Sequence, residues 1–148
     1  MKKNSGIPTL FRVGWFNFHK NHKKYFNDEL AKYNLSLIQA FCLLMVNASV
    51  EVNQKDLADG LYLSKGAITK AINKLESEEL IIREKSSRDR RQFILKVSDD
   101  GKDLIPHLMD INMRWEEKMG IKELSPEFIR VFHDLTSRSI DLNFEKEE

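Results

Sequence analysis

The chain has 148 residues, of which 41% are hydrophobic and 32% are charged, a composition typical of ordinary globular proteins. This length suits one domain with its own core, or a small domain joined to oligomerisation helices. The net charge of only +1 lacks the basic signature of many nucleic-acid-binding domains. The sequence has no long apolar run and no secretory leader, and its single cysteine excludes an internal disulfide, which together predict a cytoplasmic protein without a membrane segment.

The first third of the chain predicts two helices. Residues 9–32 form a long helical segment that is rich in aromatic side chains. Ser36 and Gln39 have the spacing of a capping box, and residues 37–46 after them are apolar nearly all round, which predicts a buried helix. Residues 50–52 are suited to add a very short third strand to a sheet that forms further along the chain.

Two short helices are predicted between residues 53 and 75, with only a few residues between them. Asn53 caps the first, Asp56 stands in the place of a capping-box acid, and Gly60 is expected to end the helix. Ser64 caps the second helix, because its hydroxyl can accept from a backbone N–H one turn later. The second helix has apolar residues at helical period, which predict a buried face: Ile68, Ala71, Ile72 and Leu75. This spacing of helices is typical of a helix-turn-helix.

The opposite face of the second helix carries small, hydrogen-bonding and cationic residues: Ser64, Lys65, Gly66, Thr69, Lys70 and Asn73. Residues 64–74 contain three lysines and no acid, whereas an ordinary surface helix more often interleaves Glu with Lys. These residue types contact DNA phosphates and base edges, so the pattern predicts a recognition helix. We expect Thr69, Lys70 and Asn73 to reach base edges. The positions nearest the helix start would hold phosphates: Ser64, Lys65 and the Gly66 amide.

Residues 81–85 and 93–98 are β-prone runs that predict a hairpin. The polar loop between them concentrates charge at four successive positions: Arg88, Asp89, Arg90 and Arg91. We expect Asp89 to pair with one arginine and hold the shape of the loop, which leaves the other arginines free to enter a minor groove. A helix-turn-helix followed by an arginine-tipped hairpin predicts a mainly α fold with a small β-hairpin wing, the winged helix-turn-helix.

The segment LADGLYLSKGAITKAINKLESEELIIREKSSRDRRQFILKVSDDG resembles the DNA-binding core of the MarR family of transcription regulators. Its most specific part is the Asp89-Arg90-Arg91 sequence of the wing, and the resemblance covers residues 25–105. It implies an intertwined dimer that holds two winged domains apart, more often a repressor, with Arg91 inserted in the minor groove. Two departures stand out. Glu79 replaces the glycine that commonly ends the recognition helix, and Val97-Ser98 replaces the usual Leu-Thr.

Two further helices are predicted at residues 99–119, which Gly120 ends, and from Ser125 onward, with Pro126 at the first helical position. Their apolar stripes should face inward: Leu104, Leu108, Ile111 and Trp115 on one helix, and Phe128, Phe132, Leu135 and Ile140 on the other. These stripes lack a partner in the winged domain, so a second copy of the chain is expected to cover them, although a monomeric bundle is an alternative.

The predicted domain organisation is a winged helix-turn-helix domain at residues 35–101. Residues 1–34 and 102–148 form a helical dimerisation region made of N- and C-terminal dimerisation helices. The polar start at residues 1–8 and the acidic end at residues 145–148 are expected to be frayed or disordered.

Other candidate sites are weaker. The pairs His19 with His22 and His107 with Asp110 have zinc-ligand spacing. Such pairs arise easily by chance, and the first lies in a cationic surface run, so no metal site is predicted. Cys42 lies in an apolar helix without a nearby cation, which indicates a buried thiol rather than a redox sensor. A pocket for a small aromatic or lipophilic effector has four candidate residues, although aromatics at helical spacing more often form plain core: Trp15, Phe16, Phe41 and Met45.

The sequence contains no glycine-rich phosphate loop and no nucleophile or metalloprotease motif, so we expect a protein that is not an enzyme and needs no cofactor. The predicted function is a sequence-specific regulator that binds double-stranded DNA as a homodimer, acting as a ligand-responsive repressor on a palindromic operator. The alternative is a winged-helix protein-docking module without specific DNA binding. Competition by nonspecific duplex and selection of one palindrome would distinguish the first from the second.

Overall fold

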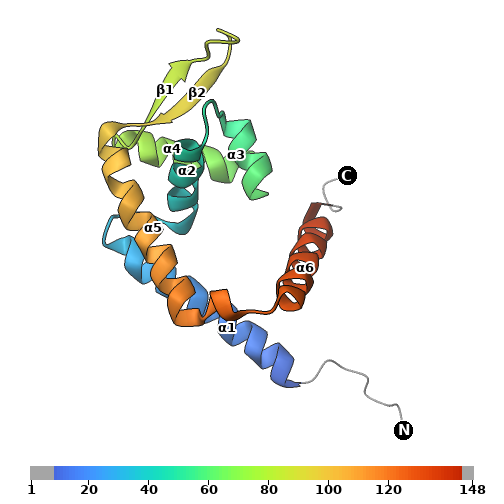
Figure 1. The fold of residues 1–148 in the computed structure, drawn as a ribbon. Coiled ribbons are helices and arrows are strands. Elements are labelled where there is room, and N and C mark those ends of the chain that lie inside the picture. Colours follow the sequence, from blue (N-terminus) through green and yellow to red (C-terminus); the bar gives the residue numbers. More distant parts are fainter. Residues whose placement is uncertain (1–8, 145–148) are drawn as a thin grey trace.

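A computed structural model describes residues 9–144, and the predicted frayed ends at residues 1–8 and 145–148 lie outside that range. Its elements follow the chain as α1 (Thr9–Ala31), α2 (Leu37–Ala48), α3 (Gln54–Leu61), α4 (Lys65–Ser77), β1 (Ile81–Lys85), β2 (Phe93–Val97), α5 (Asp99–Met119), a short 3-10 helix η1 (Ile121–Glu123) and α6 (Pro126–Phe144). The predicted mainly α fold with a β-hairpin wing is confirmed, and Figure 1 shows the hairpin projecting from the helices. No helix among the described residues is long and apolar enough to cross a membrane.

The starts of the helices are determined by local capping residues. Ser36 and Asn53 form the two predicted capping boxes, each accepting a hydrogen bond from the backbone N–H three residues later. Ser64 likewise accepts from the N–H of Ala67 at 3.2 Å, and Ser98 accepts from that of Gly101 at 3.0 Å. Because each cap satisfies an amide group that has no partner within its helix, these contacts stabilise the start of each helix independently of tertiary packing.

The hairpin pairs β1 and β2 in antiparallel register, from Ile81 opposite Val97 to Lys85 opposite Phe93. The predicted third strand at residues 50–52 is wrong, because the sheet of the described residues has only these two strands. A single bond connects that segment to the sheet, in which the Leu95 N–H donates to the carbonyl of Val52 at 2.8 Å. The chain then turns into the cap of α3 after this bond, which leaves no length for a ladder.

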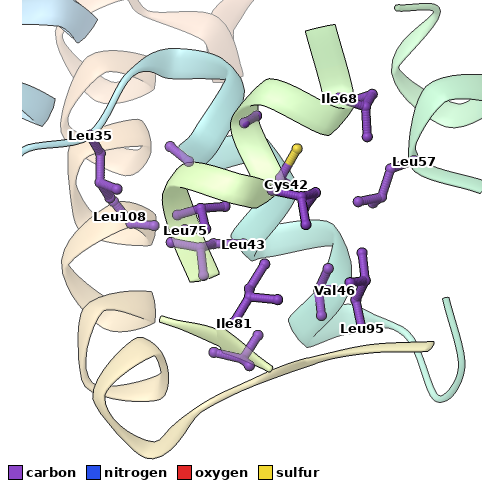
Figure 2. Close-up of a cluster of buried hydrophobic side chains, with 14 of the residues drawn as sticks. Leu35, Cys42, Leu43, Val46, Leu57, Ile68, Leu75, Ile81, Leu95 and Leu108 are labelled. Atoms are coloured by element: carbon purple, nitrogen blue, oxygen red, sulfur yellow. The ribbon is translucent and has the colours of Figure 1, made fainter. Parts of the chain in front are cut away.

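The core lies between α2, α3, α4 and the hairpin, as the close-up of Figure 2 shows. The predicted apolar face of α4 is buried, and fully buried side chains from its neighbours pack in the same cluster: Cys42 and Leu43 from α2, Leu57 from α3 and Ile81 from β1. Burying an apolar side chain of this size stabilises the folded state by about 1.5–3 kcal/mol. Packing the buried face inward holds the opposite face of α4 toward solvent.

Two expectations about the helices of this domain are wrong. Residues 37–46 are not buried all round, because Phe41 is 45% exposed. Gly60 does not end α3, which continues to Leu61 and ends at Tyr62 with a φ of +52°. Gly60 instead marks a close helix contact, since a Cβ there would lie 2.7 Å from the Cε of Met45 in α2.

The first half of α5 belongs to the same core as the winged domain. Leu108 and Ile111 are 3% and 1% exposed within the single chain, and Figure 2 places Leu108 beside Leu35. The expectation that this whole stripe needs a second subunit is therefore wrong for these two residues. Gly120 ends α5 as predicted, in the left-handed conformation with a φ of +64°.

The helix α6 stands apart from the winged domain in Figure 1. Its aromatic residues Phe128 and Phe132 are 51% and 43% exposed, and Leu135 is also exposed. The expectation that these side chains point into a core is wrong for the single chain. The N-terminal half of α1 is similarly exposed, with Phe11, Trp15 and Phe16 all facing solvent. The single chain therefore leaves two apolar helical surfaces uncovered.

Candidate nucleic-acid interface

The exposed face of α4 brings together the six positions that the sequence predicts for DNA contact. All of them are exposed: Ser64, Lys65, Gly66, Thr69, Lys70 and Asn73. They lie opposite the buried stripe of the same helix, which packs against α2, α3 and β1. The binary pattern of this helix therefore orients a polar, cationic surface outward on a rigid support.

The N-terminus of α4 is open in front of Gly66, because a Cβ added there would meet no atom within 4 Å. Ser64 satisfies the N–H of Ala67, while the amides of Lys65 and Gly66 belong to the first turn, whose N–H groups have no acceptor within the helix. These amides and the positive end of the helix dipole favour an anion such as a phosphate.

The lysines of α4 differ in their electrostatic environment. Lys74 forms an ion pair with Glu78 one turn later, which compensates its charge. In the part of the chain that the structure describes, Lys65 and Lys70 have no carboxylate within 4.0 Å. The local charge of +3 in the sequence therefore comes down to two uncompensated cations on the outward face.

A further contact, which was not predicted from the sequence, connects Arg83 of β1 to α4. Its Nε donates to Oε1 of Glu76 at 2.8 Å, and its Nη2 donates to Oδ1 of Asn73 at 3.3 Å. Only the alternation of side chains along β1 could have indicated this contact from the sequence. Arg83 lies on the same strand face as the buried Ile81 and therefore points toward α4. The contact places a third cation at the edge of the outward face of α4, although its charge is paired with that of Glu76.

The loop of the wing is held by hydrogen bonds to its own backbone. The buried Ser86 accepts from the N–H groups of Arg88 and Asp89 at 3.1 and 3.2 Å. Asp89 accepts from the N–H of Arg91 at 3.0 Å and from the side chain of Gln92 at 3.4 Å. The expectation that Asp89 pairs with an arginine side chain is therefore wrong. Asp89 still holds the shape of the loop, but through a backbone amide.

The three arginines of the wing are not equivalent. Arg88 lies 3.5 Å from Oε2 of Glu51, and the other carboxylate oxygen of Glu51, Oε1, accepts from the hydroxyl of Ser87 at 2.6 Å. Arg90 and Arg91 are exposed and, among the described residues, have no ion-pair partner. Glu51, whose side chain is only 19% exposed, thus ties the wing to the segment before α3, a contact between residues too distant for the sequence to predict.

The four predicted effector-pocket residues do not come together. An apolar cavity of about 430 Å³ lies between α1, α2 and α5, and of the four only Phe41 lines it. Trp15 and Phe16 are exposed on α1, and Met45 packs at Gly60. The cavity is lined instead by other apolar residues of the three helices, among them Leu30, Leu37, Leu44, Ile105, Met109 and Met113.

The histidines and the cysteine sit in packing environments. His22 packs against Trp115 and Phe26, with ring centroids 5.0 and 4.8 Å away, and burial together with the nearby His19 lowers its pKa. No group of three or more His, Cys, Asp or Glu side chains among the described residues is arranged to hold a metal ion. Cys42 is fully buried, and burial raises the pKa of its thiol to about 11.

Comparison with known proteins gives a consistent result. The sequence model of the MarR family matches residues 35–93. The HTH-type transcriptional regulator SarZ of Staphylococcus epidermidis is 26% identical over 125 residues, which cover 84% of each chain, and SarZ of Staphylococcus aureus is 24% identical over the same span.

Solved structures share the fold over nearly the whole chain. The crystal structure of MarR is 25% identical, with a TM-score of 0.64, and the match covers 94% of this chain and 99% of that one. The S. aureus MepR–DNA complex is 19% identical with a TM-score of 0.71, over 92% of this chain and 97% of that one. Together with the hairpin wing and the exposed face of α4, these likenesses show a MarR-family domain at residues 35–93, within a chain that shares the winged helix-turn-helix fold of MarR-family regulators.

Proposed function

We propose that the protein binds double-stranded DNA sequence-specifically as a homodimer, that it represses transcription from a palindromic operator, and that a small effector relieves this repression. The observation that carries this proposal is the outward face of α4, where Lys65 and Lys70 are uncompensated among residues that suit phosphate and base contacts. The exposed Arg90 and Arg91 extend the same cationic surface onto the wing. MepR, whose fold this chain shares, has been crystallised with DNA, which supports the same reading.

The roles of the individual residues follow from their positions on α4. Lys65 lies at the helix start, where it would hold a phosphate, whereas Lys70 and Asn73 lie one and two turns further along, where they would meet base edges. Arg91 at the wing tip would enter a minor groove, because the negative potential there is strongest over A·T tracts.

Selection from random duplexes with purified protein tests the proposal. We expect one sequence with two inverted half-sites whose centres lie about 34–36 Å apart. Asn73→Ala should relax the preference at one or two positions, at a cost on the order of 1–3 kcal/mol. Lys65→Ala is the matched control, which should weaken all duplexes alike and lower the salt slope by about one. No selected sequence, together with no competition by nonspecific duplex, would favour a protein-docking module instead.

The proposed homodimer is supported by the two uncovered apolar surfaces, on α6 and on the N-terminal half of α1. Exposed aromatic residues at this density on long helices are unusual for a monomer and typical of helices that a partner covers. Two copies would place two α4 helices for the two half-sites of a palindrome.

The proposed effector site is the apolar cavity of about 430 Å³ between α1, α2 and α5. Its volume and lining suit a small aromatic or lipophilic molecule. Neither tryptophan lines it, so DNA affinity is a better readout than tryptophan emission. Met109→Arg, which places a charge at the exposed rim, should abolish any response to phenolic acids or lipophilic cations while leaving operator binding in their absence unchanged.

A further inference from the structure

Arg83 joins the wing to the recognition helix through a forked contact. It lies on β1, on the strand face of the buried Ile81, and its guanidinium reaches two residues that are one turn apart on α4. Nε donates to Glu76 at 2.8 Å, and Nη2 donates to the amide oxygen of Asn73 at 3.3 Å. The side chains of Arg83 and Glu76 are 33% and 31% exposed, so the pair lies partly sheltered at the edge of the face.

This contact determines how the amide of Asn73 is turned. A guanidinium carries only hydrogen-bond donors, so the atom of Asn73 that faces it must be the carbonyl oxygen. Turning the amide over would bring its NH₂ group against Nη2, donor against donor. Glu76 holds the guanidinium in place by a charge-assisted bond, which keeps the oxygen of Asn73 engaged and leaves its NH₂ group for other partners.

The orientation of Asn73 restricts the base that it can read. An unconstrained asparagine prefers adenine, because its oxygen accepts from N6 while its NH₂ group donates to N7. With its oxygen turned toward Arg83, Asn73 presents mainly its NH₂ group to a base, and guanine offers two acceptors, O6 and N7, on its major-groove edge, whereas adenine offers only N7. We infer that Arg83 is a specificity-determining residue that makes Asn73 select guanine over adenine. This inference rests on the proposed recognition of DNA by α4.

Base preference at the position read by Asn73 tests the inference. Sequence selection with wild type and Asn73→Ala identifies that position as the one whose preference disappears in the variant. Wild type should prefer guanine there. Arg83→Met removes the fork and frees the amide, so the preference should shift toward adenine by about tenfold. Lys85→Met is the matched control, because it removes one cation from the same face of β1 without a contact to α4 among the described residues.

Two further variants separate positioning from simple charge. Glu76→Gln weakens the hold on Arg83 and should shift the preference in the same direction as Arg83→Met, whereas loss of a negative charge alone would strengthen binding to all duplexes alike. In the Asn73→Ala background, Arg83→Met should no longer alter base preference. Circular dichroism and thermal melting verify that each variant is folded. If Arg83→Met does not fold, Glu76→Gln still tests the inference.

The outcomes are distinguishable. A shift toward adenine that needs Asn73 supports the inference. Adenine preference in the wild type, or an Arg83→Met variant that weakens all duplexes as uniformly as Lys85→Met, overturns the inference but leaves the proposed function standing. A wild-type protein that selects no sequence at all overturns the proposed function, and the inference with it.

Discussion

At the scale of single residues, Glu79 shows how a departure from a family pattern is accommodated. It follows the C-terminus of α4 with a φ of +58°, the left-handed region that favours glycine. The N–H of Leu80 donates to the carbonyl of Leu75 at 2.9 Å, which closes the end of the helix, and the hydroxyl of Ser98 donates to the carbonyl of Glu79 at 2.6 Å. The conformation that glycine would adopt is thus retained by a residue that pays a steric penalty.

Glu79→Gly should therefore stabilise the fold. The substitution removes a left-handed penalty of roughly 1–2 kcal/mol. Glycine also adds entropy to the unfolded chain, which lowers the free energy of unfolding by roughly 0.4–1 kcal/mol. Urea unfolding should show a net gain of about 0.5–1 kcal/mol in the free energy of unfolding. Asn34→Gly is the control, because Asn34 also has a positive φ of 56° but asparagine tolerates it well, so its gain should be smaller. An equal gain at both positions would contradict the explanation.

Cys42 provides a second prediction, about pH. Burial raises the pKa of its thiol from 9.0 to about 11. As the pH rises, the thiol therefore loses its proton in the unfolded chain before it does so in the folded protein. The thiol's contribution to stability is therefore intact below about pH 9 and declines as the pH rises from 9 toward 11. Unfolding experiments across this range should show a stability difference between wild type and Cys42→Ala that narrows with rising pH. At neutral pH a thiol reagent should react only as fast as the fold opens, and rapid modification would contradict the burial.

At the scale of elements, the wing depends on contacts that fix a short polar loop. Ser86 and Asp89 accept from successive backbone N–H groups, and Glu51 ties the loop to the segment before α3. These contacts hold Arg90 and Arg91 at the tip without occupying their guanidinium groups. A loop prepared in this way loses less conformational entropy when it binds.

Variants of the wing distinguish a positioned loop from a diffuse positive charge. Asp89→Ala removes the acceptor for the Arg91 N–H, so it should weaken DNA binding by about 1 kcal/mol although it also removes a negative charge. Asp89→Asn is the matched control, because it keeps an acceptor oxygen and should bind as tightly as wild type or more tightly. Tighter binding by Asp89→Ala in a fluorescence titration would mean that the loop acts only through its charge.

Arg91→Ala should lower affinity on the order of 1–3 kcal/mol, and most on operators with A·T-rich flanks, because a narrow minor groove concentrates negative potential. Duplexes that share one operator and differ only in their flanks measure this dependence. An equal loss on A·T-rich and G·C-rich flanks would place Arg91 on the phosphate backbone instead. Circular dichroism should show that the fold of the variant is unchanged.

At the scale of the whole molecule, one core unites the winged domain with the first half of α5, while α6 and the N-terminal half of α1 extend away from it (Figure 1). The ion pair between Arg114 of α5 and Glu29 of α1, at 3.1 Å, further connects these two helices. Both α1 and α5 pack against α2, which in turn packs against α4, so a continuous set of packed side chains connects these helices to α4.

The uncovered surfaces predict a dimer at micromolar concentration, with a mass by light scattering of twice 17.4 kDa. Phe132→Glu places a charge in the exposed aromatic stripe of α6 and should shift the mass toward that of one chain. Arg130→Glu is the control, because it lies roughly 200° around the same helix from Phe128 and Phe132 and should leave the mass unchanged. A wild-type mass near 17.4 kDa would contradict both the dimer and the model of two half-sites.

The sequence by itself determined the starts of the helices, the hairpin, the buried stripe of α4 and its outward face. These features depend on interactions within about four residues, such as a cap and its amide, or on a period that one element shows alone. Tertiary structure decided the features that depend on residues far apart in the chain. Arg83 meets Asn73 across 10 residues, Ser87 meets Glu51 across 36, and Arg114 meets Glu29 across 85.

The same distinction explains which expectations failed. A stripe of apolar residues shows that an element needs a partner, but not which partner, so Leu108 and Ile111 found theirs within the chain while Phe128 and Phe132 did not. Asp89 was expected to pair with an arginine side chain, but it accepts a hydrogen bond from a backbone amide, because in a short loop the nearest donors to an aspartate are backbone N–H groups. Local chemistry fixes the direction in which each helix faces. Only the packed structure decides what each face meets.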